Sequence, residues 1–169
     1  MAAGATYEPI ATSTVSGSTT NTVTFSSLGS YTDIILVCSF TATSGTAYGG
    51  LRFNGDTATN YSTTILSGNG TSAASSRATS ANYIKLVDYG AGTTIPALGI
   101  ANIFSYGGST NKTCLNIESN DKNGSGAVVR YVGLWRSTAA ITSITVFEQG
   151  GSTYFAAGST FTLYGIKAA

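Results

Sequence analysis

Few side chains in this 169-residue chain could do acid–base or metal chemistry, because it contains no histidine. Histidine is the commonest general base and a frequent transition-metal ligand. The serines lack a Gly-x-Ser-x-Gly motif, and no histidine is present to activate them. Cys38 and Cys114 lie far apart and form no paired-cysteine motif, so we predict no zinc site. We expect Cys38, within an apolar run, to be a buried free thiol; a disulfide to Cys114 is the alternative.

Two carboxylates in predicted strands, Glu118 and Glu148, raise the question of glycoside hydrolysis. Glycosidases of the jelly-roll type place two carboxylates across a sugar in a cleft, and such clefts carry several aromatic platforms. This chain has a single tryptophan, Trp135. The favoured interpretation is therefore isolated surface or turn acids, and a jelly-roll hydrolase is a remote alternative. We predict that the protein is not an enzyme and has no catalytic residues and no cofactor.

Two clusters of Asn, Asp and Glu supply the hard oxygen ligands that calcium prefers. They are Asn54, Asp56 and Asn60 in one loop, and Glu118, Asn120 and Asp121 in another segment. Neither cluster has the spacing of a calcium-binding loop with a terminal glutamate. Because Asn and Asp are also the usual turn residues, turns are the favoured interpretation, with calcium as the alternative.

Aromatic residues near predicted strand ends are the candidates for contact with a ligand or partner. These are Tyr48, Tyr61, Tyr83, Tyr106, Trp135 and Tyr154. Tyrosine offers a flat apolar face and a polar tip, which suits a sugar ring. The same properties suit a protein interface equally well, so the residues alone leave both partners open.

Charge is sparse along the whole chain. Charged residues make up 9% of the sequence, against about 25% in a typical soluble domain, and the net charge is +1. The basic residues are scattered singly, so we expect no nucleic-acid partner. The start of the chain resembles no signal peptide and no segment has membrane-spanning length, so we expect synthesis in a cytoplasm and no membrane insertion.

The apolar pattern has a period of two residues and is interrupted by Gly, Asn, Asp and Ser, which indicates strands joined by turns. We predict strands near residues 6–11, 22–28, 33–42, 49–54, 60–67, 82–88, 95–106, 112–119, 127–136, 142–149 and 159–167. Strand 33–42 is apolar on both faces at its start, so it should be central. The stretch Ser67 to Ser80 is predicted to be a long exposed loop. The expected fold is a single domain, residues 1–169: an all-β sandwich of the jelly-roll type with about ten short antiparallel strands.

Four segments together carry a resemblance to a known class of protein. They are 5–11 (ATYEPIA), 31–37 (YTDIILV), 51–56 with 60–62 (LRFNGD and NYS), and 158–167 (GSTFTLYGIK). In this order they resemble small virion proteins of tailed bacteriophages, and similar segments end longer tail-fibre proteins. The resemblance spans nearly the whole chain, and its motifs are turn and strand-edge signatures.

The resemblance implies a β-sandwich displayed on a virus particle. The chain shows no stalk, heptad pattern or collagen-like repeat before the predicted sandwich, so we expect a capsid-surface decoration or accessory protein. A tail-fibre tip or adhesin that binds host-surface glycan is the alternative. Either role implies contact with other virion proteins and with copies of the same chain, because symmetric repetition is the rule in such assemblies.

Overall fold

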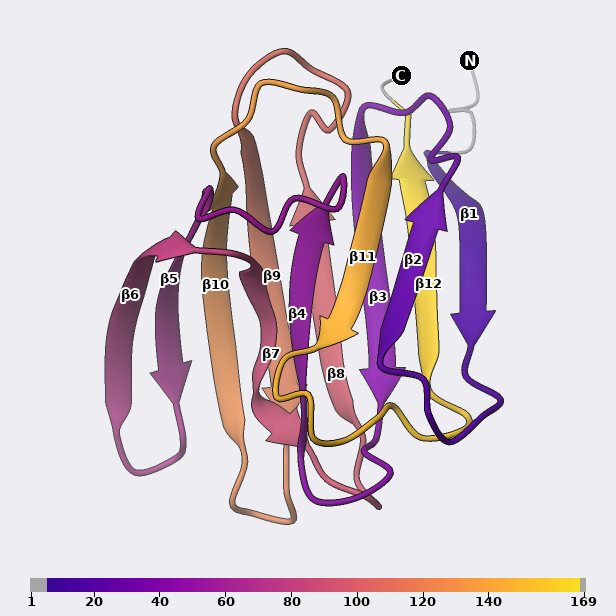
Figure 1. Cartoon of the computed structure of the whole chain (residues 1–169). Coiled ribbons are helices and arrows are strands. Elements are labelled where there is room, and N and C mark those ends of the chain that lie inside the picture. The colour runs from indigo at the N-terminus through magenta and orange to yellow at the C-terminus, as the bar shows by residue number, and fades with distance from the viewer. Residues whose placement is uncertain (1–5, 168–169) are drawn as a thin grey trace.

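The computed structural model describes residues 6–167, which form twelve strands and no helix. All paired strands are antiparallel, and they form two sheets that face each other (Figure 1). The strands are β1 (Tyr7–Thr14), β2 (Thr22–Ser26), β3 (Asp33–Phe40), β4 (Ala47–Phe53), β5 (Tyr61–Gly68), β6 (Ala73–Ala81), β7 (Ile84–Ala91), β8 (Ala97–Ile103), β9 (Lys112–Asn120), β10 (Ala127–Trp135), β11 (Ser143–Glu148) and β12 (Thr160–Ile166).

The two sheets differ in width. The large sheet has eight strands in the order β1-β12-β3-β8-β9-β10-β5-β6, and the small sheet has four in the order β2-β11-β4-β7. The all-β sandwich expected from the sequence is confirmed, whereas this strand order does not confirm the finer jelly-roll prediction. Because the small sheet is half as wide, the hairpin of β5 and β6 extends beyond β7, as Figure 1 shows at its left side.

Alternation along each strand builds the core between the sheets. In β3, Ile34, Leu36 and Cys38 point inward and are fully buried, and β3 lies inside the large sheet between β12 and β8, as its apolar start predicted. The burial of such side chains is the main favourable term in folding. Gly133 of β10 has a specific role here: a Cβ added to it would lie 2.5 Å from Ile84, so glycine permits the sheets to approach closely.

The predicted loop between Ser67 and Ser80 is wrong, because most of it is strand β6. A tight turn joins β5 to β6: Asn69 Oδ1 accepts the N–H groups of Thr71 at 3.1 Å and Ser72 at 2.9 Å. The expected exposure is confirmed, since seven of the nine residues of β6 are exposed and the other two are partly buried. The segment is an edge strand of Ala, Ser and Thr with one arginine, Arg77, and it is held by its backbone ladder to β5 and not by burial.

Both cysteines are free and fully buried. Cys38 Sγ donates to the carbonyl of Gly99 at 3.3 Å, and burial raises the pKa of this thiol to about 12. Burial also raises the pKa of Cys114. The free thiol expected at position 38 is confirmed, and the alternative disulfide is absent.

Candidate functional site

Three of the six aromatic candidates lie in the core and not at the surface. Tyr61, Tyr106 and Trp135 are each at most 5% exposed. The hydroxyl of Tyr106 donates to the carbonyl of Gly29 at 2.7 Å, and Trp135 Nε1 donates to the carboxylate of Asp56 at 2.7 Å. Burial raises the pKa of Tyr61 to about 12. These rings therefore fill the sandwich, and their polar tips fasten neighbouring loops.

The other three candidates are accessible but do not form one patch. Tyr154 is 38% exposed, and Tyr48 and Tyr83 are half-buried. The ring of Tyr48 lies beside Gly90, near the end of β7, whereas Tyr83 precedes the first residue of that strand. Of the six predicted residues, only Tyr83 lines the cavity between β6 and β7.

The two carboxylates considered for hydrolysis are both buried, and each has its own donors. Glu148 is 5% exposed and accepts the N–H groups of Tyr48 at 3.2 Å, Gly150 at 3.0 Å and Gly151 at 2.6 Å. It therefore closes the turn after β11. Glu118 is 1% exposed, so it is not the surface or turn acid that the sequence suggested.

Glu118 belongs to a row of three inward-facing polar residues on β9, which we call the polar ladder: Asn116, Glu118 and Asn120. Their contacts are Asn116 Nδ2 donating to the Lys85 carbonyl at 3.0 Å, Glu118 accepting the N–H groups of Asp88 at 2.8 Å and Tyr89 at 3.1 Å, and Asn120 Nδ2 donating to the Gly90 carbonyl. All these partners are backbone groups of β7, the edge strand of the small sheet; the Tyr131 hydroxyl is a further donor to Glu118. Side chains of the large sheet thus satisfy hydrogen-bonding groups on the β7 backbone. At an edge strand such groups would otherwise need a further strand as a partner.

The carboxyl group of Glu118 is buried between the two sheets. Burial raises the pKa of its carboxyl above the ordinary value, while hydrogen bonds from the Tyr131 hydroxyl and from the backbone of Asp88 and Tyr89 oppose that shift. Burial and the neighbouring Glu118 carboxyl also raise the pKa of Tyr131. A buried carboxylate with three hydrogen-bond donors is well suited to hold a strand in place.

The two segments considered for calcium have structural roles in their loops. The carboxylate of Asp56 accepts the Ala58 N–H at 2.9 Å and Asn60 Nδ2 at 3.0 Å, in addition to Trp135. Asn54 begins a turn with a φ of 52°. In the second segment, Asp121 accepts the N–H of Gly124 at 2.7 Å. Across residues 6–167, no three Cys, Asp or Glu residues gather as a metal-binding group.

A feature that the sequence reasoning missed is the outward side of the large sheet, which we call the apolar face. It bears six exposed aliphatic side chains, Leu66, Leu98, Ile100, Leu115, Val128 and Val132. The strand register places them close together, since Val132 lies opposite Leu115 and Ile100 lies opposite the half-buried Ile117. Exposure reaches 66% at Val128 and 51% at Val132. An exposed aliphatic surface of this kind is a candidate interaction site.

Charge is sparse on the apolar face. Arg130 lies between Val128 and Val132 on β10, opposite Leu66 on one side and Ile117 on the other. Arg77 lies on the edge strand β6, opposite Thr64, and Asp33 is the first residue of β3. Within residues 6–167 no acidic side chain pairs with either arginine. Strands β8 and β9, which lie between β10 and β3, contribute only apolar and hydroxyl- or amide-bearing residues to this side of the sheet.

The outward side of the small sheet, which we call the threonine face, has a different chemistry. It bears Thr22, Thr24, Ser26, Arg52, Ser143 and Thr145. Thr24 and Thr145 face each other with their hydroxyls 3.1 Å apart. The guanidinium of Arg52 lies 3.9 Å from the centre of the Phe147 ring. This face is rich in hydroxyl groups and carries a cation that is already engaged by the Phe147 ring.

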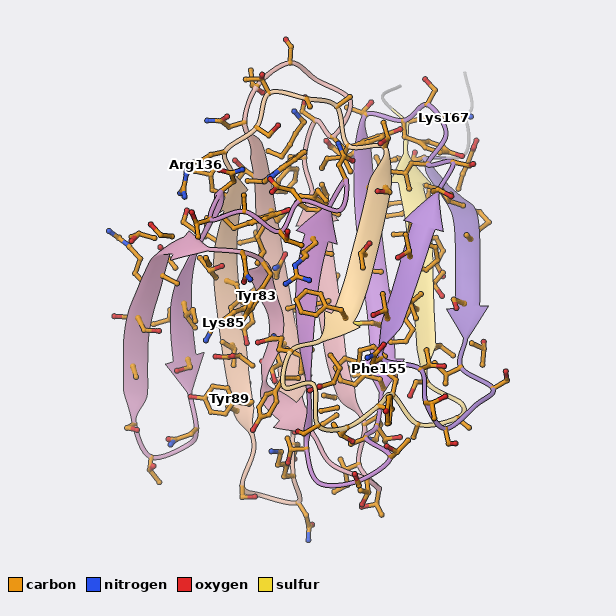
Figure 2. The ribbon with its side chains drawn as sticks, in the orientation of Figure 1. Tyr83, Lys85, Tyr89, Arg136, Phe155 and Lys167 are labelled. Carbon is orange, nitrogen blue, oxygen red and sulfur yellow. The ribbon has the colours of Figure 1, made fainter. Side chains whose placement is uncertain are left out.

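The third feature is a cavity of about 440 Å³ where the β5–β6 hairpin extends past the small sheet, which we call the β6–β7 groove. It is lined by Thr57, Thr59, Thr63, Ala78, Ser80, Ala81, Asn82, Tyr83 and Lys85. Thr63 and Ala78 point to the inner side of the large sheet, so the groove opens on the side opposite the apolar face. Figure 2 shows Tyr83, Lys85 and Tyr89 in succession on the side of β7 that faces the hairpin.

Comparison with known proteins returned no matching family model, no similar curated protein and no similar solved structure. No helix long and apolar enough to cross a membrane occurs in the described part of the chain.

Proposed function

We propose that this chain is a non-enzymatic structural component of a tailed-phage virion, a capsid-surface decoration or accessory protein whose apolar face packs against a second copy of the chain. The observation that carries the docking is the contiguous group of exposed aliphatic residues around Leu115 and Val132. The particle context rests on the resemblance of the turn and strand-edge segments described above.

The size of the apolar face fits a pair of identical subunits. Eight strands spaced about 4.8 Å apart, with seven residues of about 3.3 Å each, cover about 34 Å by 23 Å, or about 800 Å². A stable protein–protein interface buries about 800 Å² on each partner. Sheets that pack face to face bury aliphatic side chains in the same way as a sandwich core.

The strand order also separates like charges in such a pair. A two-fold axis parallel to the strands, between the central β8 and β9, would place β8 over β9 and β10 over β3 of the other copy. Arg130 of β10 then faces β3 and not the second Arg130. The edge strand β6, with Arg77, faces β1. The isologous arrangement therefore brings no two arginines together.

The test is sedimentation velocity on the purified chain over a range of concentrations. We expect the wild type to dimerise and Val132→Asp to weaken the dimer by about tenfold or more, because burial of a carboxylate in an apolar contact is costly and Arg130, on the same side of β10, offsets only part of that cost. The matched control is Thr24→Asp on the threonine face, which should dimerise like the wild type. A wild type that stays monomeric throughout, or an equal effect of both variants, would contradict docking through the apolar face.

Position on the particle is tested separately, by electron microscopy and by protein analysis of separated shells and tails. Density for the sandwich on the shell is the expected result. Presence in tail fractions alone would contradict the capsid role and would favour the second candidate, a tail-fibre tip that binds host-surface glycan. The observation that favours this second candidate is the β6–β7 groove.

A further inference from the structure

The β6–β7 groove is bounded by two strands that belong to different sheets. Thr63 of β5 is at its base, Ala78 and Ser80 of β6 form one wall, and Lys85 of β7 belongs to the other. The walls are held by backbone ladders and by the polar ladder, which fixes β7 to the large sheet. The cavity is therefore a preformed feature of the fold, with a volume within the range of small-molecule sites.

The lining of the groove is rich in hydroxyl groups and has one charged side chain, Lys85, which is paired with an acid outside the lining. Thr57, Thr59, Thr63, Ser80 and Tyr83 contribute hydroxyls and Asn82 an amide, and no carboxylate belongs to the lining. The Lys85 ammonium is 2.7 Å from the Asp88 carboxylate, which neutralises it. Such a lining favours a neutral ligand over a phosphate or another anion.

A second observation points to a ligand at the base of the groove. Thr63 is 2% exposed, and its hydroxyl has no hydrogen-bond partner among residues 6–167. Buried hydroxyl groups in native proteins are almost always satisfied by the protein, by ordered water or by a ligand. The side-chain oxygens of Asn116 and Asn120 also lack a partner among residues 6–167, but of the three residues only Thr63 belongs to the lining of the groove, so its hydroxyl is left to whatever occupies the groove.

Tyr83 gives the rim of the groove an aromatic surface in a fixed position. Its ring packs edge-on against Phe147, with 5.5 Å between ring centres and an interplanar angle of 85°. Phe147 is itself covered by Arg52, whose Nε donates to the Asn82 carbonyl at 3.0 Å. A tyrosine ring held in this way can stack on the apolar side of a sugar while its hydroxyl bonds to the sugar's polar edge.

A peptide strand is a poorer fit to the wall formed by β7. Strand addition needs free backbone N–H and C=O groups at a sheet edge. At β7 the Lys85 and Gly90 carbonyls and the Asp88 and Tyr89 N–H groups are already bonded to the polar ladder. The Tyr89 carbonyl also accepts the ammonium of Lys122 at 2.8 Å.

We propose that the β6–β7 groove binds a neutral, hydroxyl-rich saccharide, with the Tyr83 ring as the stacking surface and the Thr63 hydroxyl as a hydrogen-bonding group at the base. The proposal deepens the second candidate function and does not depend on dimerisation, because the groove and the apolar face lie on opposite sides of the large sheet. A monomeric protein and a dimer therefore present the same groove.

The test is amide NMR of the whole chain titrated with cellotriose, maltotriose and triacetylchitotriose, with sialyllactose as the charged comparator. Shift changes should be confined to residues 57–63 and 78–85 and should be strongest with a neutral saccharide. We expect Tyr83→Ala to weaken this binding about tenfold or more, since it removes the stacking surface. Tyr154→Ala is the matched control, because it removes an accessible tyrosine outside the groove and should leave the affinity unchanged.

Thr63→Val keeps the shape of the side chain without its hydroxyl, and should weaken binding by severalfold with an unchanged fold. The titration is repeated on Val132→Asp, so that failure of the docking face and failure of the groove can be told apart. No shift changes with any neutral saccharide, changes outside the groove, or equal effects of Tyr83→Ala and Tyr154→Ala would each overturn the proposal. Preferential binding of an uncharged Ser/Thr peptide in the groove would also overturn it.

Discussion

The two outward faces of this sandwich are built on the same kind of strand but have opposite chemistry. On the threonine face, Thr24 and Thr145 present hydroxyls to water and to each other. On the apolar face, Leu115 and Val132 occupy the same structural position, facing away from the core, and both are exposed. Folding of a two-layer sandwich needs only the inward faces to be apolar. The sandwich does not need the aliphatic residues of the apolar face in order to fold, and these residues are therefore candidates for assembly.

In strand β10 a residue that faces the core is adjacent to a residue on the apolar face. This pair gives the prediction with the largest effect. Gly133→Val should lower the free energy of unfolding by about 3 kcal/mol, because the new side chain would enter the space of Ile84 between the sheets. Val132→Thr, one residue earlier on the apolar face, should change it by no more than about 0.5 kcal/mol. Urea unfolding of both variants measures the contrast.

Sedimentation of the folded Val132→Thr protein then completes the comparison, because this variant should weaken the dimer while its stability is unchanged. If Val132→Thr destabilised the fold as much as Gly133→Val, the apolar face would be part of the folding core, and the contrast between the two outward faces would lose its meaning.

Much of the fold could be predicted from the sequence, because strands with one buried side show a clear period of two. Ile34, Leu36 and Cys38 of β3 follow this pattern, and their burial is as the pattern indicates. Strand β6 could not be predicted, because Ala and Ser have weak strand propensity and neither side of β6 is buried. Its conformation is set by the ladder to β5, which is a tertiary interaction.

The interaction surfaces were harder to predict than the strands. Tyr61 and Trp135 were expected at a surface because they adjoin turns, but a ring near a strand end can point to either side. The apolar face did leave a signal: in 127–136, Val128 and Val132 alternate with the equally apolar Val129 and Tyr131. Apolar residues at both the odd and the even positions of a strand are also typical of a strand that is buried on both sides. The sequence alone could therefore not show that one side of this strand is exposed.

The second prediction uses Glu118 to separate the stability of the fold from association through the apolar face. Because the pKa of Glu118 is raised in the folded protein, the folded state binds the proton more tightly than the unfolded chain does. The contribution of this group to stability is therefore complete below its ordinary pKa of 4.5 and is lost as pH rises through the folded pKa. Glu118→Gln should remove this loss, which for one group is at most about 1.4 kcal/mol per pH unit.

Urea unfolding of the wild type and Glu118→Gln at several pH values measures the difference. Asp56→Asn is a control of opposite sign: hydrogen bonds, first that of Trp135, lower the pKa of Asp56, so its contribution is present above the ordinary value and is lost as pH falls. Dimerisation should stay constant over the same range, because no acidic side chain of β8, β9 or β10 points to the apolar face; Glu118 of β9 points inward. Parallel pH profiles for the wild type and Glu118→Gln would contradict the assigned burial of this charge.

The smallest effect is expected on the threonine face, where Thr24→Val and Thr145→Val together would replace a hydroxyl pair by two aliphatic side chains. The exposed hydrogen bond between them and a cross-strand valine pair are each worth less than about 1 kcal/mol, so the free energy of unfolding should change by no more than about 0.5 kcal/mol. The double variant should also keep the dimerisation constant of the wild type, since two valines among hydrated threonines do not form a patch of interface size. Sedimentation and urea unfolding measure both quantities. New higher-order association of this variant would mean that a small apolar addition is enough to recruit a second copy, and dimerisation could then no longer be credited to the extent of the apolar face.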